Sequence, residues 1–116
     1  MSDTLFFCTL TELKRKQSIG KRVRNLSIFA TWTDGQVNAY INRCPHLGTS
    51  LEFMPDQFLN IDKTLIQCTT HGALFLPDTG ECVSGPCAGE FLEPIELVLE
   101  NDSLMIGFAG ETQDLT

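Results

Sequence analysis

The sequence lacks several features that would each point to a particular class of protein. Every apolar stretch is interrupted within a few residues, so none is long enough to span a membrane. Only two histidines are present, and no lysine or arginine follows Lys63. Nucleic-acid binding needs a basic surface, whereas this chain has a net charge of −7. We therefore expect neither a membrane-spanning protein nor a nucleic-acid partner.

The start of the chain and its cysteines indicate a compartment. Met1–Phe7 has no basic residue and only a short apolar run, so it resembles neither a signal peptide nor a membrane anchor. The five cysteines are an odd number and cannot all pair, which suits a reducing compartment. We therefore expect a cytoplasmic protein. Cys82 and Cys87 are close enough in sequence to form a disulfide, but we expect small buried apolar residues there.

Charge is distributed unevenly along the chain. Six of the eight basic residues lie between Lys14 and Arg24, and the run 14–16 is expected in a turn. Residues 64–116 carry nine acidic residues and no basic one. Two interpretations stay open for this half: an ordinary solvated acidic surface, or electrostatic steering toward a basic face on a partner protein.

Short candidate strands separated by Gly, Pro and Asp predict one all-β domain over residues 1–116. The strongest signal is a hairpin with arms at 25–33 and 36–42, because Asp34-Gly35 is typical of a type I′ turn. Residues 9–12 fit a capping box and predict one helical turn. The other expected strands are 5–10, 64–68, 73–76, 95–100 and 103–108. We expect a weakly structured loop over 51–60 and a disordered tail over 110–116.

Two short motifs contain metal-binding side chains. Cys44-Pro45-His46 is followed, after a gap, by Cys68-Thr69-Thr70-His71. Two Cys and two His can hold zinc, whose paired ligands are usually two to four residues apart. They can also hold a [2Fe–2S] cluster in which two His replace two Cys on one iron. The single residue between Cys44 and His46 favours the cluster, because the two side chains are too close to chelate one ion comfortably.

Together with Ser84-Gly85-Pro86-Cys87, these motifs resemble the Rieske iron–sulfur family. The resemblance extends from the hairpin near Asp34 to the strands near Phe108. It implies a small antiparallel β-sandwich with a cluster-binding subdomain, about residues 43–87, in which two hairpin-tip loops hold one [2Fe–2S] cluster. The implied ligands are Cys44 and Cys68 on one iron and His46 and His71 on the other.

The resemblance also implies roles for residues around the cluster. Leu47 would shield it from water, Gly48 and Gly72 would let the backbone approach it, and Pro86 would stiffen a covering loop. Each of these residues has an ordinary alternative, as a core or turn residue.

Two further positions bear on the reduction potential. High-potential members of the family have Ser and Tyr hydroxyls beside the cluster, where this chain has Ala73 and Phe75. They also have a disulfide between the ligand loops, where this chain has Thr49 and Thr70. We therefore expect a potential at the low end of the Rieske range, near about −150 mV.

The implied function is that of a soluble ferredoxin, not an enzyme. Such a protein passes single electrons from a flavin-dependent reductase to a Rieske non-haem iron oxygenase of a ring-hydroxylating dioxygenase system. A mononuclear iron site of its own would need two further His and a carboxylate, and both His are already used. One alternative is a small Rieske-like subunit of a larger oxidoreductase such as nitrite reductase. Another is a zinc-binding or cluster-free interaction module.

Overall fold

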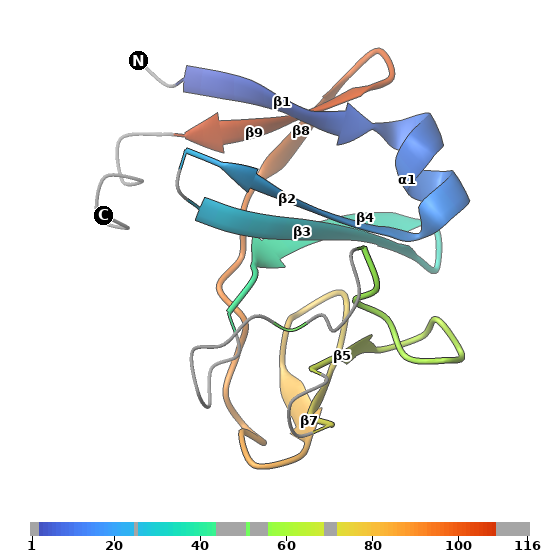
Figure 1. Ribbon diagram of the computed structural model, residues 1–116, viewed down its shortest axis with the longest axis vertical. Helices are drawn as coiled ribbons and strands as arrows, with labels where there is room; N and C mark the ends of the chain where they lie inside the picture. Colours follow the sequence, from blue (N-terminus) through green and yellow to red (C-terminus); the bar gives the residue numbers. More distant parts are fainter. Residues whose placement is uncertain (1–2, 25, 44–50, 52–55, 69–71, 109–116) are drawn as a thin grey trace.

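The computed structural model describes residues 3–24, 26–43, 51, 56–68 and 72–108. These residues form short strands and one short helix (Figure 1), which confirms the predicted all-β class. In chain order the elements are β1 (Asp3–Thr9), α1 (Leu10–Lys16), β2 (Ser18–Val23), β3 (Leu26–Thr33), β4 (Gln36–Ile41), β5 (Ile66–Gln67), β6 (Leu74–Phe75), β7 (Cys82–Ser84), β8 (Leu97–Glu100) and β9 (Ser103–Phe108).

The described strands pair into three small antiparallel sheets, with the orders β1-β9-β8, β2-β3-β4 and β5-β6-β7. The first two sheets lie in the upper part of Figure 1, and the third forms a smaller lobe below them. The segment that returns from the lobe to β8 lies alongside β4. Two main-chain hydrogen bonds hold it there, from the Ile41 N–H to the Glu93 carbonyl and from the Ile95 N–H to the Ala39 carbonyl. The predicted β-sandwich with a smaller subdomain is therefore present.

The middle sheet, β2-β3-β4, is buried on both faces. Alternate side chains of a strand point to opposite sides, and in β3 Ile28 and Ala30 enter one core whereas Phe29 enters the other. The upper core consists of Phe7, Cys8, Leu13, Ile19, Ile28, Ala30, Ala39, Ile41, Leu104 and Ile106. The lower core consists of Phe29, Tyr40, Leu51, Phe58, Ile66, Cys68, Ala73, Phe75, Cys82, Cys87 and Leu92. One sheet thus anchors both halves of the molecule.

Local sequence signals placed two hairpins and the helix start correctly. Asp34 and Gly35 have φ angles of 52° and 74°, as a type I′ turn requires. The C-terminal hairpin closes with Glu100 opposite Ser103. Thr9 caps α1, because its Oγ1 accepts a 3.0 Å hydrogen bond from the Glu12 N–H.

The structure differs from expectation in two elements. The run 14–16 lies in the last turn of α1 and not in a turn, a position where basic side chains are favoured by the helix dipole. Strand β2 was not predicted, because Lys21 and Arg22 interrupt its apolar pattern. The described residues of the segment 51–60 form no helix or named strand, as expected of a loop, but Leu51 and Phe58 are fully buried in the lower core.

Phe58 packs face to face on Phe29, with ring centroids 4.5 Å apart and planes at 3°. The ring fits only because Gly20 lies above it: a Cβ at this position would stand 2.6 Å from Cζ and 2.7 Å from Cε2 of Phe58. The backbone of Gly20 is outside the left-handed region, so space and not conformation requires glycine here.

Replacing Gly20 with Ala should therefore destabilise the protein by about 1–3 kcal/mol, the usual cost of overpacking a filled core. Denaturant unfolding of the variant measures this. The cost should shrink when Phe58→Leu is introduced in the same chain, because the smaller side chain gives the new methyl group room. Equal costs with Phe58 and with Leu would contradict the packing explanation.

Candidate metal centre

The second ligand motif forms a tight loop at the tip of the β5–β6 hairpin. Its two ends are tied by main-chain hydrogen bonds: Gly72 N–H donates to the Cys68 carbonyl at 2.8 Å, and Cys68 N–H donates to the Ala73 carbonyl at 2.9 Å. Gly72 has φ +70°, in the left-handed region that favours glycine. Cys68 is fully buried at the start of this loop. The predicted ligand His71 lies between these residues and outside those the structure describes.

The first ligand motif also lies outside the described residues, including Cys44, His46, Leu47 and Gly48, but both of its flanks are described. Asn42, buried at the end of β4, accepts a 2.8 Å hydrogen bond at Oδ1 from the Leu51 N–H. Its own N–H donates to the Ser27 carbonyl at 2.7 Å. Asn42 thus holds the two ends of the segment 43–50 together and fixes them to β3. The sequence alone does not predict this role, because no local pattern distinguishes an asparagine that joins the two ends of a loop.

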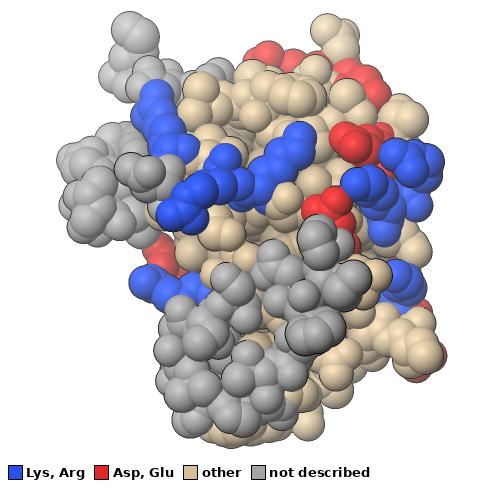
Figure 2. All heavy atoms as spheres, viewed as in Figure 1, with Lys and Arg blue, Asp and Glu red and all other residues tan. Residues whose placement is uncertain are grey.

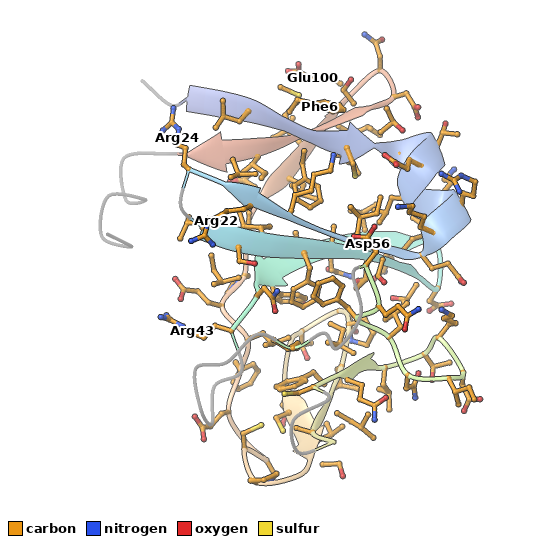
Figure 3. The ribbon with its side chains drawn as sticks, viewed as in Figure 1. Phe6, Arg22, Arg24, Arg43, Asp56 and Glu100 are labelled. Atoms are coloured by element: carbon orange, nitrogen blue, oxygen red, sulfur yellow. The ribbon has the colours of Figure 1, made fainter. Side chains whose placement is uncertain are left out.

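A second anchor lies at Asp56, on the next part of the chain. Oδ2 of Asp56 lies 2.8 Å from Lys16 Nζ, and Oδ1 accepts a 2.8 Å hydrogen bond from the Gly20 N–H (Figure 3). The Asp56 carbonyl accepts from Ser18 Oγ at 2.6 Å. Partial burial opposes ionisation of Asp56, but the hydrogen bonds from Lys16 and Gly20 outweigh it and hold its pKa below the ordinary 3.8. The carboxylate therefore stays charged and keeps this segment on β2.

The Gly85-Pro86 loop packs directly on the second ligand loop. A Cβ on Gly85 would lie 2.8 Å from Cα and 3.0 Å from Cβ of Ala73, and Gly85 has φ +106°. Pro86 is exposed on the outer side of this loop. A loop that covers the ligand site would have to pack this closely on Ala73. Gly85 allows the contact because it has no side chain, whereas Pro86 lies on the exposed side of the loop.

The predicted residues Ala73 and Phe75 lie in the interior of the lobe. Ala73 is 1% exposed and Phe75 is fully buried, both in the same core as Cys68. Nearby, Tyr40 donates a 2.6 Å hydrogen bond from its hydroxyl to the Pro77 carbonyl. Burial, with a smaller effect of Asp78, raises the pKa of Tyr40 to about 12, so this hydroxyl remains a donor. These contacts fix the hairpin that carries the second loop to the middle sheet.

Among the described residues no group of three Cys, His, Asp or Glu side chains is placed to hold a metal, since three of the four predicted ligands are not described. What is described suits a cluster. A buried cysteine begins a closed loop with a left-handed glycine, and a second loop packs on it. A cavity of about 560 Å³ lies elsewhere, between β4 and β8 near Tyr40 and Leu97, and none of its lining residues belongs to the ligand loops.

Comparison with known proteins agrees with this geometry. The family model described as Rieske [2Fe-2S] domain matches residues 3–101, which include both ligand motifs and the Gly85-Pro86 loop. The chain belongs to the Rieske [2Fe–2S] domain family. The cofactor of this family is a [2Fe–2S] cluster bound by Cys and His side chains. No curated protein sequence matches this chain.

Solved structures show the same fold. The ferredoxin of carbazole 1,9a-dioxygenase from Nocardioides aromaticivorans IC177 superposes with a TM-score of 0.71 at 19% identity, over 89% of this chain and 95% of that one. The Sphingomonas yanoikuyae B1 ferredoxin gives 0.72 at 22% identity, over 90% and 97%. The terminal oxygenase of carbazole 1,9a-dioxygenase from the Nocardioides strain gives 0.74 at 17% identity, over 91% of this chain and 30% of that one. In the described part of this Rieske chain, no helix has the length and apolar character to cross a membrane.

We expect Asn42→Ala to lower the free energy of unfolding by about 1–3 kcal/mol, because the buried Leu51 N–H loses its acceptor. The change should also speed the loss of iron to a chelator, since the ends of the first ligand segment are no longer clasped. Chemical unfolding and the decay of visible absorbance measure the two effects.

Asn38→Ala, within β4, provides the control. The Asn38 Nδ2 is buried and has no hydrogen-bond partner among the described residues, so its removal breaks no such bond. If Asn38→Ala and Asn42→Ala released iron at the same rate, the clasp would have no role in holding the site.

Proposed function

We propose that this Rieske protein is a ferredoxin-type carrier that holds one [2Fe–2S] cluster and passes single electrons between partner proteins. The observation that carries the proposal is the family match over residues 3–101, together with the closed loop that begins at buried Cys68. Cys44 and Cys68 would bind one iron, and His46 and His71 the other. When bound, the cluster supplies a site that takes up and gives back one electron.

The chain's own residues would set the surroundings of this site. The hydrogen bonds at Asn42 and Gly72 would hold the two loops in place before and after electron transfer. Leu47 and Gly48 would pack against the cluster from the first loop. Ala73, Phe75 and the Gly85-Pro86 loop would limit the access of water from the other side. A rigid, partly dry site suits electron transfer, because little rearrangement accompanies the change in charge.

The acceptor would be a Rieske oxygenase and the donor a flavin-dependent reductase. Two observations support this. Ferredoxins of carbazole dioxygenase share this fold, and one similar structure is a complex of reduced oxygenase and oxidized ferredoxin. The charges also suit a basic partner, since Glu81 and Glu90 lie on the lobe, whereas the basic residues of α1 and β2 gather on the sandwich (Figure 2).

A second candidate is a Rieske subunit or domain that works within a larger oxidoreductase. The terminal oxygenase from Nocardioides supports it, because the same fold makes up 30% of that chain. The two candidates differ in one respect: a carrier must exchange electrons with a partner in repeated, salt-sensitive encounters, whereas a fixed subunit need not.

The potential tests the role of Ala73. We expect a midpoint potential near about −150 mV, because neither Ala73 nor Phe75 has a hydroxyl to stabilise the added electron. Ala73→Ser should raise it by roughly 20–60 mV, which is the equivalent of one hydrogen bond of about 0.5–1.5 kcal/mol. A redox titration followed by visible circular dichroism measures both values.

The matched control is Ala88→Ser, the same change at an exposed position in the covering loop. Its potential should equal that of the wild type. A clearly positive wild-type potential, or the same shift in both variants, would show that the residue types at positions 73 and 75 do not set the potential.

Electron exchange tests the carrier role itself. Cytochrome c, a small haem protein with a basic surface, serves as the one-electron acceptor in stopped-flow measurements. The rate should fall as salt is raised, because exposed charges are screened beyond about 10 Å at 0.1 M salt. Glu90→Lys should slow the reaction by a factor of about two to ten.

Glu100→Lys is the control, since Glu100 lies on the β8–β9 hairpin at the end of the molecule away from the lobe (Figure 3). We expect its effect to be much smaller. An electron-transfer rate that does not change with salt, and that falls equally in Glu90→Lys and Glu100→Lys, would argue against a carrier that docks through the lobe.

A further inference from the structure

The thiols of Cys82 and Cys87 lie against each other in the lower core. Their Sγ atoms are 2.8 Å apart, and the two residues are 1% and 0% exposed. Cys82 begins β7, and Cys87 follows the Gly85-Pro86 turn. A disulfide bond has an S–S distance of about 2.05 Å, so the two sulfurs need to move by only roughly 0.8 Å to bond.

The backbone fixes this approach. Cys82 donates its N–H to the Glu90 carbonyl at 2.8 Å and accepts a 3.0 Å bond from the Gly89 N–H. The Cys87 carbonyl in turn accepts a 2.9 Å bond from the Glu90 N–H. Both cysteines are therefore tied to the same short stretch, 89–90, which brings them together at the base of the loop 83–86. The fold therefore holds the main chain of the two residues close together, and the side-chain rotamers bring the sulfurs into contact.

We propose that Cys82 and Cys87 are a modification site that forms a reversible disulfide at the base of the Gly85-Pro86 loop. The oxidant is a peroxide. The two thiols give up two protons and two electrons, the S–S bond forms, the O–O bond of hydrogen peroxide breaks, and two water molecules result. A dithiol reductant reverses the step by exchange.

Position in the fold distinguishes this pair from Cys8. Both cysteines of the pair are buried beneath a loop that is exposed at Val83, Ser84 and Pro86. Cys8, by contrast, lies in the upper core, which contains no other described cysteine. Cys8 therefore has no described thiol beside it with which to form a disulfide, and burial raises the pKa of its thiol to about 11.

The disulfide would stiffen the loop that packs on Ala73. Gly85 stands in the middle of the six-residue ring that the bond closes, and it is the residue in close contact with Ala73. This consequence rests on the proposed function, because it assumes that the loop covers a cluster. The disulfide itself does not depend on that assumption.

The holoprotein offers a direct test by mass. It is exposed to a small excess of hydrogen peroxide, quenched with catalase, alkylated in denaturant and digested with a protease that cleaves after Glu. Glu81 and Glu90 flank the pair, so the peptide 82–90 contains both cysteines and no other. We expect this peptide to be unalkylated and lighter by two hydrogen atoms, and to take up two alkyl groups after treatment with dithiothreitol.

Cys87→Ala is the matched variant, in which the peptide should show no such protection. Two outcomes overturn the proposal. One is a wild-type peptide that still carries two alkyl groups after peroxide. The other is oxidation that ends in a sulfinic acid or in a bond to Cys8 or Cys68.

The rate of iron loss to a chelator tests the effect on the loop. After identical peroxide treatment, iron should leave the wild type several-fold more slowly than Cys87→Ala. Equal rates despite a formed disulfide would overturn the coupling between the loop and the cluster. A chain that binds no iron would instead overturn the proposed function, and the mass measurement would still decide whether the disulfide forms.

Discussion

The stacked rings of Phe29 and Phe58 are the contact on which both halves of this molecule depend. Phe29 projects from the lower face of a sheet whose upper face is already filled by Ile28 and Ala30. Phe58 meets it from the chain that leads out of the first ligand segment and into β5. Tyr40, which packs in the same core and donates to the Pro77 carbonyl, adds to this attachment of the lobe. The ligand loops can be held rigidly because a buried aromatic pair joins their lobe to the sandwich.

The site is built by backbone geometry more than by special side chains. Main-chain bonds close the loop between Cys68 and Gly72, Asn42 draws together the ends of the other segment, and Gly85 lets a third loop pack down on Ala73. Each of these contacts either gives a buried polar group its hydrogen-bond partner or fills space in the interior of the lobe. Cys82 and Cys87 flank Gly85 in the chain, so the segment that packs on Ala73 also contains a close pair of thiols.

The sequence predicted what local chemistry determines. Asp34-Gly35 specified its hairpin because only a few residue pairs accept positive φ at both positions, and Thr9 specified the helix start through its side-chain oxygen. The ligand motifs and the Gly85-Pro86 segment pointed to the family that the comparison then confirmed.

The remaining features depend on contacts between distant residues. Phe58 lies in a segment with no periodic pattern and is buried only because Phe29 and Gly20 make room for it. The roles of Asn42 and Asp56 could not be predicted either, since their partners are nine residues away for Asn42 and 36–40 residues away for Asp56. The spacing of Cys82 and Cys87 allows a contact, but the contact itself depends on the pairing of the backbone at 82 with 90, and it is seen in the 2.8 Å distance between the two sulfurs.

The central claim is that Cys44, His46, Cys68 and His71 hold one [2Fe–2S] cluster. Its most direct test is pulsed EPR of the dithionite-reduced protein, with iron and sulfide analysis of the same sample. We expect two irons and two sulfides per chain and a spin-half signal coupled to two imidazole nitrogens. One coupling should disappear in His71→Cys. A signal without nitrogen coupling, or a colourless protein with bound zinc, would contradict it.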